Sequence, residues 1–210
     1  MAGLAMSSHK KLIRKEIRYQ RKELEKENKR EMDEKILEKL LALPEINQAE
    51  LVYAYASIDG EVDTYELIRR LWIKQIRVAL PKVEGKEVFF YIVDNFEELI
   101  SGSYGILEPG EGCSPALGIS GPVITPGLAF SREGVRVGYG GGYYDRFFCR
   151  EPGHVRIGVA YPFQVRKLDC AERHDWKVDG IVTPTEVIWS EPSDRTSSHK
   201  IKHGQRAGIY

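Results

Sequence analysis

The sequence predicts an α/β protein in which a mainly parallel sheet is covered on both faces by helices. Short apolar segments suited to buried strands alternate along the chain with segments whose apolar residues recur at helical spacing. A chain of 210 residues, 42% of them apolar, is long enough for one well-buried core, and its size favours a single domain. We assign that domain to residues 8–190 and expect the polar, aperiodic segment 191–210 to be a disordered tail.

The helices of the first half are predicted from periodicity and from capping residues. Apolar residues recur at near-helical spacing over residues 8–43, and the weak helix former Asn28 predicts a division into two helices. Asp63 and Glu66 have the spacing of a capping box, which predicts that a helix follows over residues 65–74.

The strands are predicted from short apolar runs bounded by turn residues. We expect strands at residues 51–56, 77–80, 87–93, 122–130, 155–161 and 180–183. The second of these stops at Pro81. A short helix is expected over residues 96–100, a surface loop over 108–121 because it is rich in Gly, Pro and Ser, and a further helix over 143–148.

The composition excludes several classes of protein. Lys and Arg together number 31 and equal the 31 acidic residues, so the chain lacks the basic excess of a dedicated nucleic-acid binder. No stretch approaches the ~20 apolar residues of a membrane span, and the first ten residues lack the apolar core of a secretory signal. Three scattered cysteines predict reduced thiols in a cytoplasmic protein, and their spacing fits neither a disulfide framework nor a zinc site.

A glycine-rich loop carries the strongest functional signal. Four glycines occupy five positions from Gly138 to Gly142, where they can take positive φ and let backbone N–H groups converge on an anion. A helix beginning near Tyr143 would direct its positive dipole end at the same point, and Asp145 could hold Mg²⁺. The alternative is a tight turn in which the glycines serve backbone geometry alone. The loop has neither the ending of a P-loop nor the spacing of a dinucleotide fingerprint.

Charged residues elsewhere supply weaker candidates. Lys10, Arg14 and Arg18 lie four residues apart, so they share one helix face and could contact phosphate oxygens. The alternative is a solvated amphipathic surface. Glu61 follows the first predicted strand and has no evident local partner, and Asp179 precedes the last predicted strand in a similar way. Substrate-binding residues of open α/β sheets gather in loops at the carboxyl ends of strands, which favours Glu61 as a binding residue.

Read together, these segments resemble the 5-formyltetrahydrofolate cyclo-ligase family, also called 5,10-methenyltetrahydrofolate synthetases. The resemblance covers residues 10–185 and preserves the family order of KKLIRKEIR, EVDTYELI, YGILEP, ITPGLAF, GVRVGYGGGYYDRFF, GVAYPFQV and KVDGIVTPTEVI. The pair PGLAF and GYGGGYYDR is specific, whereas the short GILEP and VDGIVT segments would mean little alone. The resemblance implies a three-layer α/β/α sandwich, which agrees with the fold predicted from the strand and helix pattern.

The resemblance also implies roles for individual residues. It assigns ATP binding to Lys10, Lys11, Arg14, Arg136, Gly138, Tyr139, Gly140, Gly141, Gly142, Tyr143 and Tyr144. It assigns folate binding to Ala56, Glu61, Tyr139, Gly140, Gly141, Gly142 and Tyr143. Tyr143 and Arg14 are the expected catalytic residues, and Asp145 and Asp179 are expected to organise Mg²⁺.

The implied reaction is the ATP-dependent closure of 5-formyltetrahydrofolate to 5,10-methenyltetrahydrofolate through phosphorylation of the formyl oxygen, with ADP and phosphate as the other products. The expected ligands are therefore folate and ATP, with Mg²⁺, and no nucleic acid or membrane. A cytoplasmic monomer is expected. The sequence departs from the family at Ser131, where an Asp usually follows the PGLAF phenylalanine, so local geometry or metal affinity could differ there.

Two other functions are compatible with parts of the sequence. Related α/β sheets carry phosphosugar isomerase and CoA-transferase-like activities, which would need no ATP. The basic first helix could belong to a non-catalytic RNA-binding module, whose affinity would depend strongly on salt. Zero net charge and the glycine loop disfavour the second alternative.

Overall fold

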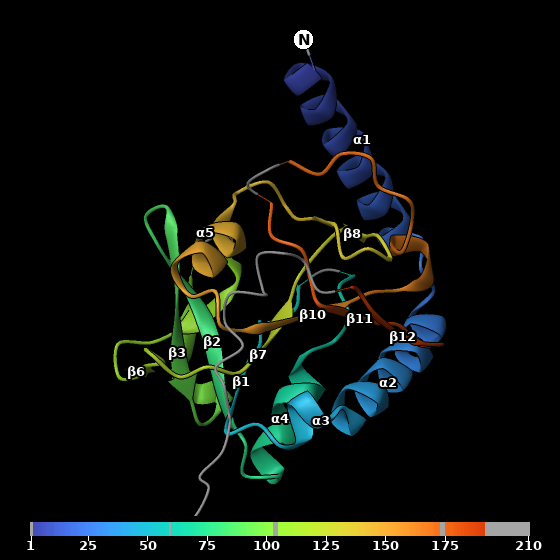
Figure 1. Ribbon diagram of the computed structural model, residues 1–210. Helices are drawn as coiled ribbons and strands as arrows, with labels where there is room; N and C mark the ends of the chain where they lie inside the picture. Colours follow the sequence, from blue (N-terminus) through green and yellow to red (C-terminus); the bar gives the residue numbers. More distant parts are fainter. Residues whose placement is uncertain (1, 59, 103–104, 173–174, 192–210) are drawn as a thin grey trace, which may run out of the picture.

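The protein is a three-layer α/β/α sandwich built on a twisted, mainly parallel sheet (Figure 1). The computed structural model describes residues 2–58, 60–102, 105–172 and 175–191. Its eight-stranded sheet runs in the order β12 (Val187–Trp189), β11 (Gly180–Val182), β10 (Val155–Val159), β7 (Pro122–Thr125), β1 (Leu51–Tyr53), β2 (Arg77–Glu84), β3 (Glu87–Val93) and β6 (Ser114–Pro115).

The centre of the sheet is parallel and its edges are antiparallel. β11, β10, β7, β1 and β2 are parallel neighbours, whereas β12, β3 and β6 join in antiparallel register. The registers Tyr53↔Val123 and Tyr53↔Ala79 join β1 to its two neighbours. The predicted fold class is therefore confirmed.

Alternate residues of each central strand face opposite helical layers. Val52 and Ala54 belong to one buried cluster with α2 (Lys26–Ala42), α3 (Pro44–Asn47) and α4 (Tyr65–Ile73). Leu51 and Tyr53 face the other way and pack in a second cluster with α5 (Tyr143–Arg150). Figure 1 shows α2, α3 and α4 together on one side of the sheet and α5 on the other. Successive side chains of a strand point to opposite faces of the sheet, and both faces are covered by helices. The sheet therefore has one core on each face.

The N-terminal helix packs outside these two layers. Side chains of α1 (Ala2–Lys22) are described from Ser8 onward, and Ile13 and Ile17 are buried against a two-stranded hairpin of β8 (Ala129–Phe130) and β9 (Arg136–Val137). The remaining short elements are the 3₁₀ helices η1 (Phe96–Glu98) and η3 (Pro162–Gln164), and a hairpin of β4 (Leu99–Ser101) and β5 (Leu107–Pro109). No helix among the described residues has the length and apolar character that crossing a membrane requires.

Two predicted helix features differ in the structure. The first two helices divide at residues 23–25 and not at Asn28. The two helices pack on different surfaces, since α1 contacts the β8–β9 hairpin whereas Leu24 and α2 contact the core of the large sheet. The predicted capping box does not form. The Asp63 carboxylate does accept the N–H of Tyr65, but the Glu66 carboxylate pairs with Arg70 instead of returning to Asp63.

Several predicted strand boundaries were also wrong. β2 continues through Pro81 because, beyond Ala79, only β3 pairs with it, so one side of the strand needs no donor. The predicted strand 122–130 is split into β7 and β8, and β9 and β12 were not predicted. The predicted loop 108–121 contains part of β5 and all of β6, and only three residues of the helix expected at 96–100 are helical. Of the predicted tail 191–210, all but Glu191 lies outside the described residues.

Candidate functional site

The candidate site lies where the strand order of the parallel sheet reverses. From β1 the chain proceeds to β2 on one side, and from β7 it proceeds to β10 on the other, although β1 and β7 are neighbours. Loops that leave adjacent strands in opposite directions open a crevice at their carboxyl ends, where ligands of such sheets bind. Here the loop after β1 carries Ala56 and Glu61, and the loop after β7 carries Gly127.

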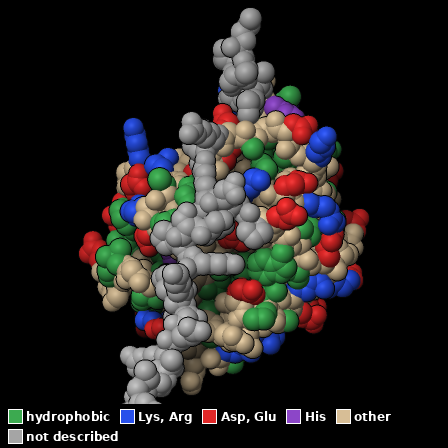
Figure 2. Space-filling view, viewed as in Figure 1, with side chains coloured by type: hydrophobic (Ala, Val, Ile, Leu, Met, Phe, Trp, Pro, Cys, Tyr) green, Lys and Arg blue, Asp and Glu red, His purple; other side chains and the backbone are tan. Residues whose placement is uncertain are grey.

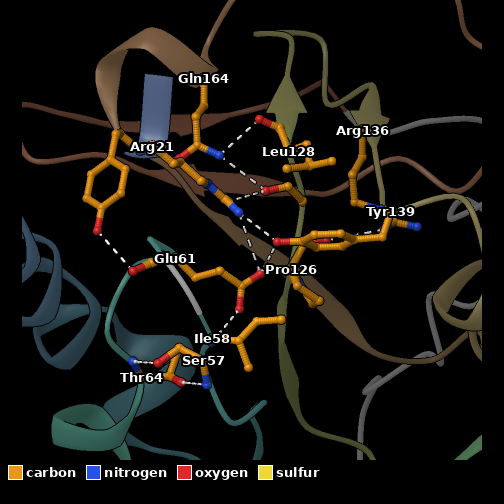
Figure 3. A network of polar contacts seen from close by, with 12 residues as sticks. Arg21, Ser57, Ile58, Glu61, Thr64, Pro126, Leu128, Arg136, Tyr139 and Gln164 are labelled. Carbon is orange, nitrogen blue, oxygen red and sulfur yellow. Dashed lines mark hydrogen bonds and ion pairs between the residues drawn. The ribbon is translucent and has the colours of Figure 1, made fainter. Parts of the chain in front are cut away.

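A buried polar network joins these loops to the glycine loop and to α1 (Figure 3). The Tyr139 hydroxyl donates to the Glu61 carboxylate and accepts a hydrogen bond from Nη1 of Arg21 at 2.6 Å. Nη1 of Arg21 lies 3.7 Å from Oε1 of Glu61, and its Nη2 donates to the Gly127 carbonyl at 2.8 Å. The Arg21 and Glu61 side chains are 6% and 4% exposed, whereas Tyr139 is 39% exposed, so the network extends from the interior to the surface.

Backbone contacts hold the Glu61 loop in place from two further directions. The second Glu61 oxygen accepts the N–H of Ile58 at 3.0 Å, which closes a tight turn. The Tyr161 hydroxyl lies 3.0 Å from the Glu61 carbonyl and 2.7 Å from Oδ1 of Asp33 on α2. Glu61 is therefore held through both its carboxylate and its carbonyl.

Burial dominates the electrostatics of the network. It raises the pKa of Glu61, although the hydrogen bonds from Tyr139 and Ile58 and the charges of Arg21 and Lys29 oppose that rise. Burial also raises the pKa of Tyr139, as does the charge of Glu61. The phenol therefore stays protonated at neutral pH and donates to the carboxylate.

The glycine loop has the backbone geometry expected of an anion-binding segment. Gly140 has φ +110° and Gly142 has φ +68°, both in the region that favours glycine. Nε of Arg14 on α1 donates to the Gly138 carbonyl at 2.8 Å, and a Cβ at Gly140 would lie 3.4 Å from the Arg14 guanidinium carbon. Among the described residues, the N–H groups of Gly140 and Gly141 make no hydrogen bond to the protein.

The two lysines assigned to ATP lie differently. Lys10 is buried, and its ammonium contacts Oε2 of Glu172 at 2.5 Å and Oδ2 of Asp175 at 2.7 Å. Burial disfavours its charged form, but these hydrogen bonds outweigh burial and raise the pKa of Lys10. Lys11 is exposed. The structure thus brings Arg14 to the glycine loop, whereas Lys10 is paired with carboxylates.

Arg136 connects the glycine loop to the loop after β7 and to α5. Its Nη1 donates to the Pro126 carbonyl at 3.2 Å and its Nη2 to Oδ1 of Asp145 at 2.9 Å. Its guanidinium carbon lies 5.8 Å from the centre of the Tyr144 ring, whose buried hydroxyl has no hydrogen-bond partner among the described residues. Burial raises the pKa of Tyr144 far above its usual value. Tyr143 packs partly against the α5 core, with the Arg146 guanidinium 5.2 Å from the centre of its ring.

The two carboxylates assigned to Mg²⁺ are each paired with an arginine. Besides Arg136, Oδ1 of Asp145 accepts the N–H of Trp176 at 3.1 Å, which leaves its second oxygen for a ligand. Asp179 accepts three hydrogen bonds from Arg156, from its N–H and Nε at 2.8 Å and from Nη2 at 2.6 Å. No group of three or more metal-ligating side chains occurs in the part of the chain that the structure describes. One oxygen of Asp145 is available to bind a metal ion, whereas both oxygens of Asp179 already accept hydrogen bonds from Arg156.

Two residues that organise the site, Arg21 and Gln164, were not predicted from the sequence. Arg21 was one of several cations on the first helix, and only its position three turns after Lys10, on the buried side with Ile13 and Ile17, could have distinguished it. Gln164 is fully buried and donates to the carbonyls of Gly127 and Leu128 at 3.2 and 2.9 Å. A glutamine in a short segment gives no sequence signal of this kind.

Ser131 has a local role. Its buried hydroxyl accepts the N–H of Val135 at 3.3 Å, and its carbonyl accepts the N–H of Gly134, so it closes the turn between β8 and β9. Whether the usual family Asp would alter affinity or rate stays a prediction.

A buried acid, a glycine loop and a cationic helix meet at the switch point of a parallel sheet, and these features define an α/β enzyme. The model of the 5-formyltetrahydrofolate cyclo-ligase family matches residues 6–184, so the chain belongs to that family. The 5-formyltetrahydrofolate cyclo-ligase of Escherichia coli strain K12 is 31% identical over 178 residues, which cover 81% of this chain and 98% of that relative. The Mus musculus relative of the same description is 25% identical, over 87% of this chain and 97% of its own length.

Solved structures agree with the sequence relatives. The 5,10-methenyltetrahydrofolate synthetase of Aquifex aeolicus superposes with a TM-score of 0.78 at 36% identity, covering 92% of this chain and 99% of that one. The synthetase of Mycoplasma pneumoniae superposes with a TM-score of 0.67 at 27% identity, covering 83% of this chain and 98% of that one. The resemblance stated from the sequence is therefore confirmed.

Proposed function

We propose that this protein catalyses the ATP-dependent cyclisation of 5-formyltetrahydrofolate to 5,10-methenyltetrahydrofolate. One observation carries the proposal beyond family membership: Arg14 of α1 reaches the Gly138 carbonyl, beside the Tyr139 hydroxyl that contacts Glu61. A cation for phosphate and a buried carboxylate for a nitrogen-rich ring thus contact neighbouring residues, Gly138 and Tyr139, of one loop. That arrangement suits a reaction that must join a nucleotide phosphate to a folate.

The nucleotide would lie along the glycine loop and the first helix. The uncommitted N–H groups of Gly140 and Gly141, the N-terminus of α5 and the Arg14 guanidinium would supply hydrogen bonds and positive charge to phosphate oxygens. The glycine loop would be held in place by Arg136, Tyr143 and Tyr144. Lys10 would contribute only if its pairing with Glu172 and Asp175 were exchanged for phosphate.

The folate would lie against the Glu61 side of the same loop. Glu61 offers a carboxylate to the N–H groups of a pterin, and Tyr139 and Ile58 present partly exposed apolar surface beside it. Ala56 is buried on the loop that carries Glu61 and would border the bound folate. The Tyr143 ring, next along the glycine loop, would help to orient the pterin toward the phosphate.

The proposed chemistry activates a poor leaving group in two steps. The formyl oxygen attacks the γ-phosphorus, an O–P bond forms, and the bond from that phosphorus to ADP breaks, which leaves an imino-phosphate at N5. N10 then attacks the formyl carbon, loses its proton, and expels phosphate as the C–O bond breaks. This chain's contribution is to align oxygen with phosphorus and to stabilise the moving charge, chiefly through Arg14 and the loop amides.

Magnesium would assist at one point of this site. Bound to the nucleotide, Mg²⁺ would neutralise phosphate charge, and Asp145 has an oxygen that could hold it. Asp179 would first have to leave Arg156, so we assign it no direct contact with the metal.

The decisive experiment is a spectroscopic assay for methenyltetrahydrofolate with the purified chain, run with and without ATP and Mg²⁺. Product formation only with ATP is expected, together with ADP in equal amount. Formation without ATP, or no product from folded protein with all substrates present, would contradict the proposal. Product formation without ATP would also restore the isomerase-like or transferase-like alternatives.

A variant of Arg14 separates the two halves of the site. Arg14→Ala removes one charge-assisted contact, so we expect the KM for ATP to rise about 10-fold while the KM for folate changes less than about 3-fold. Lys15→Ala, which removes an exposed cation one residue away, is the matched control. Equal effects on both substrates would show that Arg14 supports the loop as a whole.

A further inference from the structure

The guanidinium of Arg21 lies between all three loops of the site. It donates to the Tyr139 hydroxyl at 2.6 Å and to the Gly127 carbonyl at 2.8 Å, and lies 3.7 Å from the Glu61 carboxylate. Figure 3 shows it directed at Tyr139 from the side opposite the Ile58 turn. One side chain of α1 therefore touches the loop after β1, the loop after β7 and the glycine loop.

The backbone of α1 is fitted to the Glu61 loop at the same residue. Gly60 precedes Glu61 and has φ +70°. A Cβ there would lie 3.0 Å from Cβ of Arg21 and 3.3 Å from its carbonyl oxygen, so the helix approaches more closely than a side chain would allow. The helix α1 and the Glu61 loop thus make their close backbone contact at Arg21 itself.

A purely structural ion pair would have a different geometry. A buried ion pair contributes to stability where its two groups are close and well oriented and further hydrogen bonds satisfy their remaining polar atoms. The nearest Arg21–Glu61 approach is 3.7 Å, the Tyr139 hydroxyl lies within hydrogen-bonding distance of both, and the buried Nε of Arg21 has no partner among the described residues. Because Tyr139 is partly exposed, this incompletely paired cation acts on a group that a ligand can reach.

We propose that Arg21 is a positioning residue that fixes the Glu61 carboxylate and the Tyr139 phenol in the arrangement that binds folate. The inference rests on the proposed function, in which these two residues contact folate. Arg21 itself is buried and acts through them. Its charge favours the ionised carboxylate, and its hydrogen bond orients the phenol oxygen so that the phenol proton points to Glu61.

The electrostatics around Glu61 make this role measurable. The ionisable groups that face its carboxylate or its backbone come from several elements, namely Arg21 on α1, Lys29 on α2, Tyr55 after β1, Tyr139 in the glycine loop, Tyr144 on α5 and Tyr161 after β10. Burial already raises the pKa of Glu61, and among the described residues Arg21 and Lys29 oppose that rise with positive charge. Removal of the Arg21 charge would raise that pKa further, so the carboxylate would be protonated over a wider range of pH.

The test compares Arg21→Gln with Lys22→Gln, which removes the same charge from an exposed neighbour on the same helix. The KM for 5-formyltetrahydrofolate, the KM for ATP and kcat are measured between pH 6 and 9, with circular dichroism to verify folding. For Arg21→Gln we expect a rise of about 10-fold in the folate KM at pH 7, larger at pH 6 than at pH 8, with changes below about 3-fold in the other two constants. Lys22→Gln is expected to match the wild type.

Arg21→Lys serves as the conservative variant and decides the matter where Arg21→Gln does not fold. It keeps the charge but loses the fork that reaches Tyr139 and Gly127 together, so the pH dependence of the folate KM should return to that of the wild type while the KM stays raised about 3-fold. In a Tyr139→Phe background the Arg21→Lys effect should shrink, because the phenol oxygen is its point of action.

The outcomes separate this inference from the proposed function. Equal rises in the two KM values, or a pH-independent loss of kcat alone, would make Arg21 a general structural residue and overturn the inference while cyclo-ligase activity stands. An Arg21 variant indistinguishable from Lys22→Gln would do the same. A wild-type chain without cyclo-ligase activity would refute the proposed function first, and the inference with it.

Discussion

Two arginine–carboxylate pairs with buried guanidinium groups, Arg156–Asp179 at the amino ends of β10 and β11 and Arg21–Glu61 in the candidate site, are built in opposite ways. Arg156 and Asp179 share three hydrogen bonds of 2.6 to 2.8 Å, and the Arg156 side chain is 2% exposed. Arg21 and Glu61 approach only to 3.7 Å, with the Tyr139 hydroxyl contacting both. The first pair is closed, whereas the second is open to a third group. Closure indicates a structural role, and openness indicates a site that a ligand completes.

The closed pair should dominate stability. Asp179→Ala leaves the Arg156 guanidinium buried without its partner, so we expect the free energy of unfolding to fall by about 3 kcal/mol in a denaturant titration. Activity per folded molecule and its Mg²⁺ requirement should stay close to those of the wild type. A shifted Mg²⁺ requirement in folded Asp179→Ala would contradict the structural role and return Asp179 to the metal.

The open pair should dominate activity. Glu61→Gln keeps the shape of the side chain but removes the charge that folate N–H groups would meet, so we expect kcat/KM for folate to fall about 10- to 100-fold. Stability should be unchanged or higher, because the cost of burying a charge disappears. If Glu61→Gln unfolds the protein as Asp179→Ala is expected to, the contrast between the two pairs fails.

The glycine beside the open pair offers a smaller test. Gly60→Ala combines a positive φ with a 3.0 Å contact to Arg21, and we expect about 1–3 kcal/mol of destabilisation and a raised folate KM. Gly85→Ala is the matched control, since Gly85 also has a positive φ, +63°, but nothing lies within 4 Å of a Cβ there. It should cost about 1 kcal/mol and leave the folate KM unchanged. Similar KM values for the two variants would show that α1 can shift away from Arg21 without consequence.

The smallest expected effect is a pH dependence of stability. Because burial raises the pKa of Glu61, the folded state holds its proton over a range of pH in which the unfolded state, with a value near 4.5, has lost it. The free energy of unfolding therefore falls as pH rises above that value, until Glu61 ionises in the folded state as well. The stability advantage of Glu61→Gln over the wild type should grow with pH across this window, as measured by urea unfolding from pH 4 to 8. A constant difference would mean that Glu61 is not penalised by burial.

The fold was largely predictable because its signals are local. The strand at 87–93 and the helix that follows the glycine loop depend on apolar runs and on glycine, which act within a few residues. Pro81 was misread because its tolerance depends on which neighbour the strand lacks, and that is a property of the sheet. The same holds for β8 and β9, which are two residues each and are stabilised by α1.

The site was predictable as a set of segments but not as a network. Arg14 lies at the glycine loop, and Glu61 and Tyr139 are in contact. That these residues bind ATP and folate stays a prediction. Arg21 was not identified because it is distinguished from the exposed cations of its helix only by burial against partners more than 30 residues away in the chain. Asp179 and Arg156 illustrate the converse, since a carboxylate in a suitable motif already has a partner from another strand.

Figure 2 shows Lys and Arg side chains interspersed with Asp and Glu side chains over the described part of one face. That mixture accords with the zero net charge of the chain and offers no extended basic surface there for a nucleic acid. On α1, Lys10, Arg14 and Arg21 contact other parts of the protein, whereas Lys11, Lys15 and Lys22 are exposed.

The packing of α1 determines whether the proposed site stays assembled. This helix is buried mainly against β8 and β9 and not against the eight-stranded sheet, so the sheet and its two cores can persist when the helix detaches. Detachment would withdraw Arg14 and Arg21 together and dismantle the site in a molecule that is otherwise native. Such a local opening would cost less free energy than global unfolding, and it would remove the proposed site from molecules that are otherwise folded.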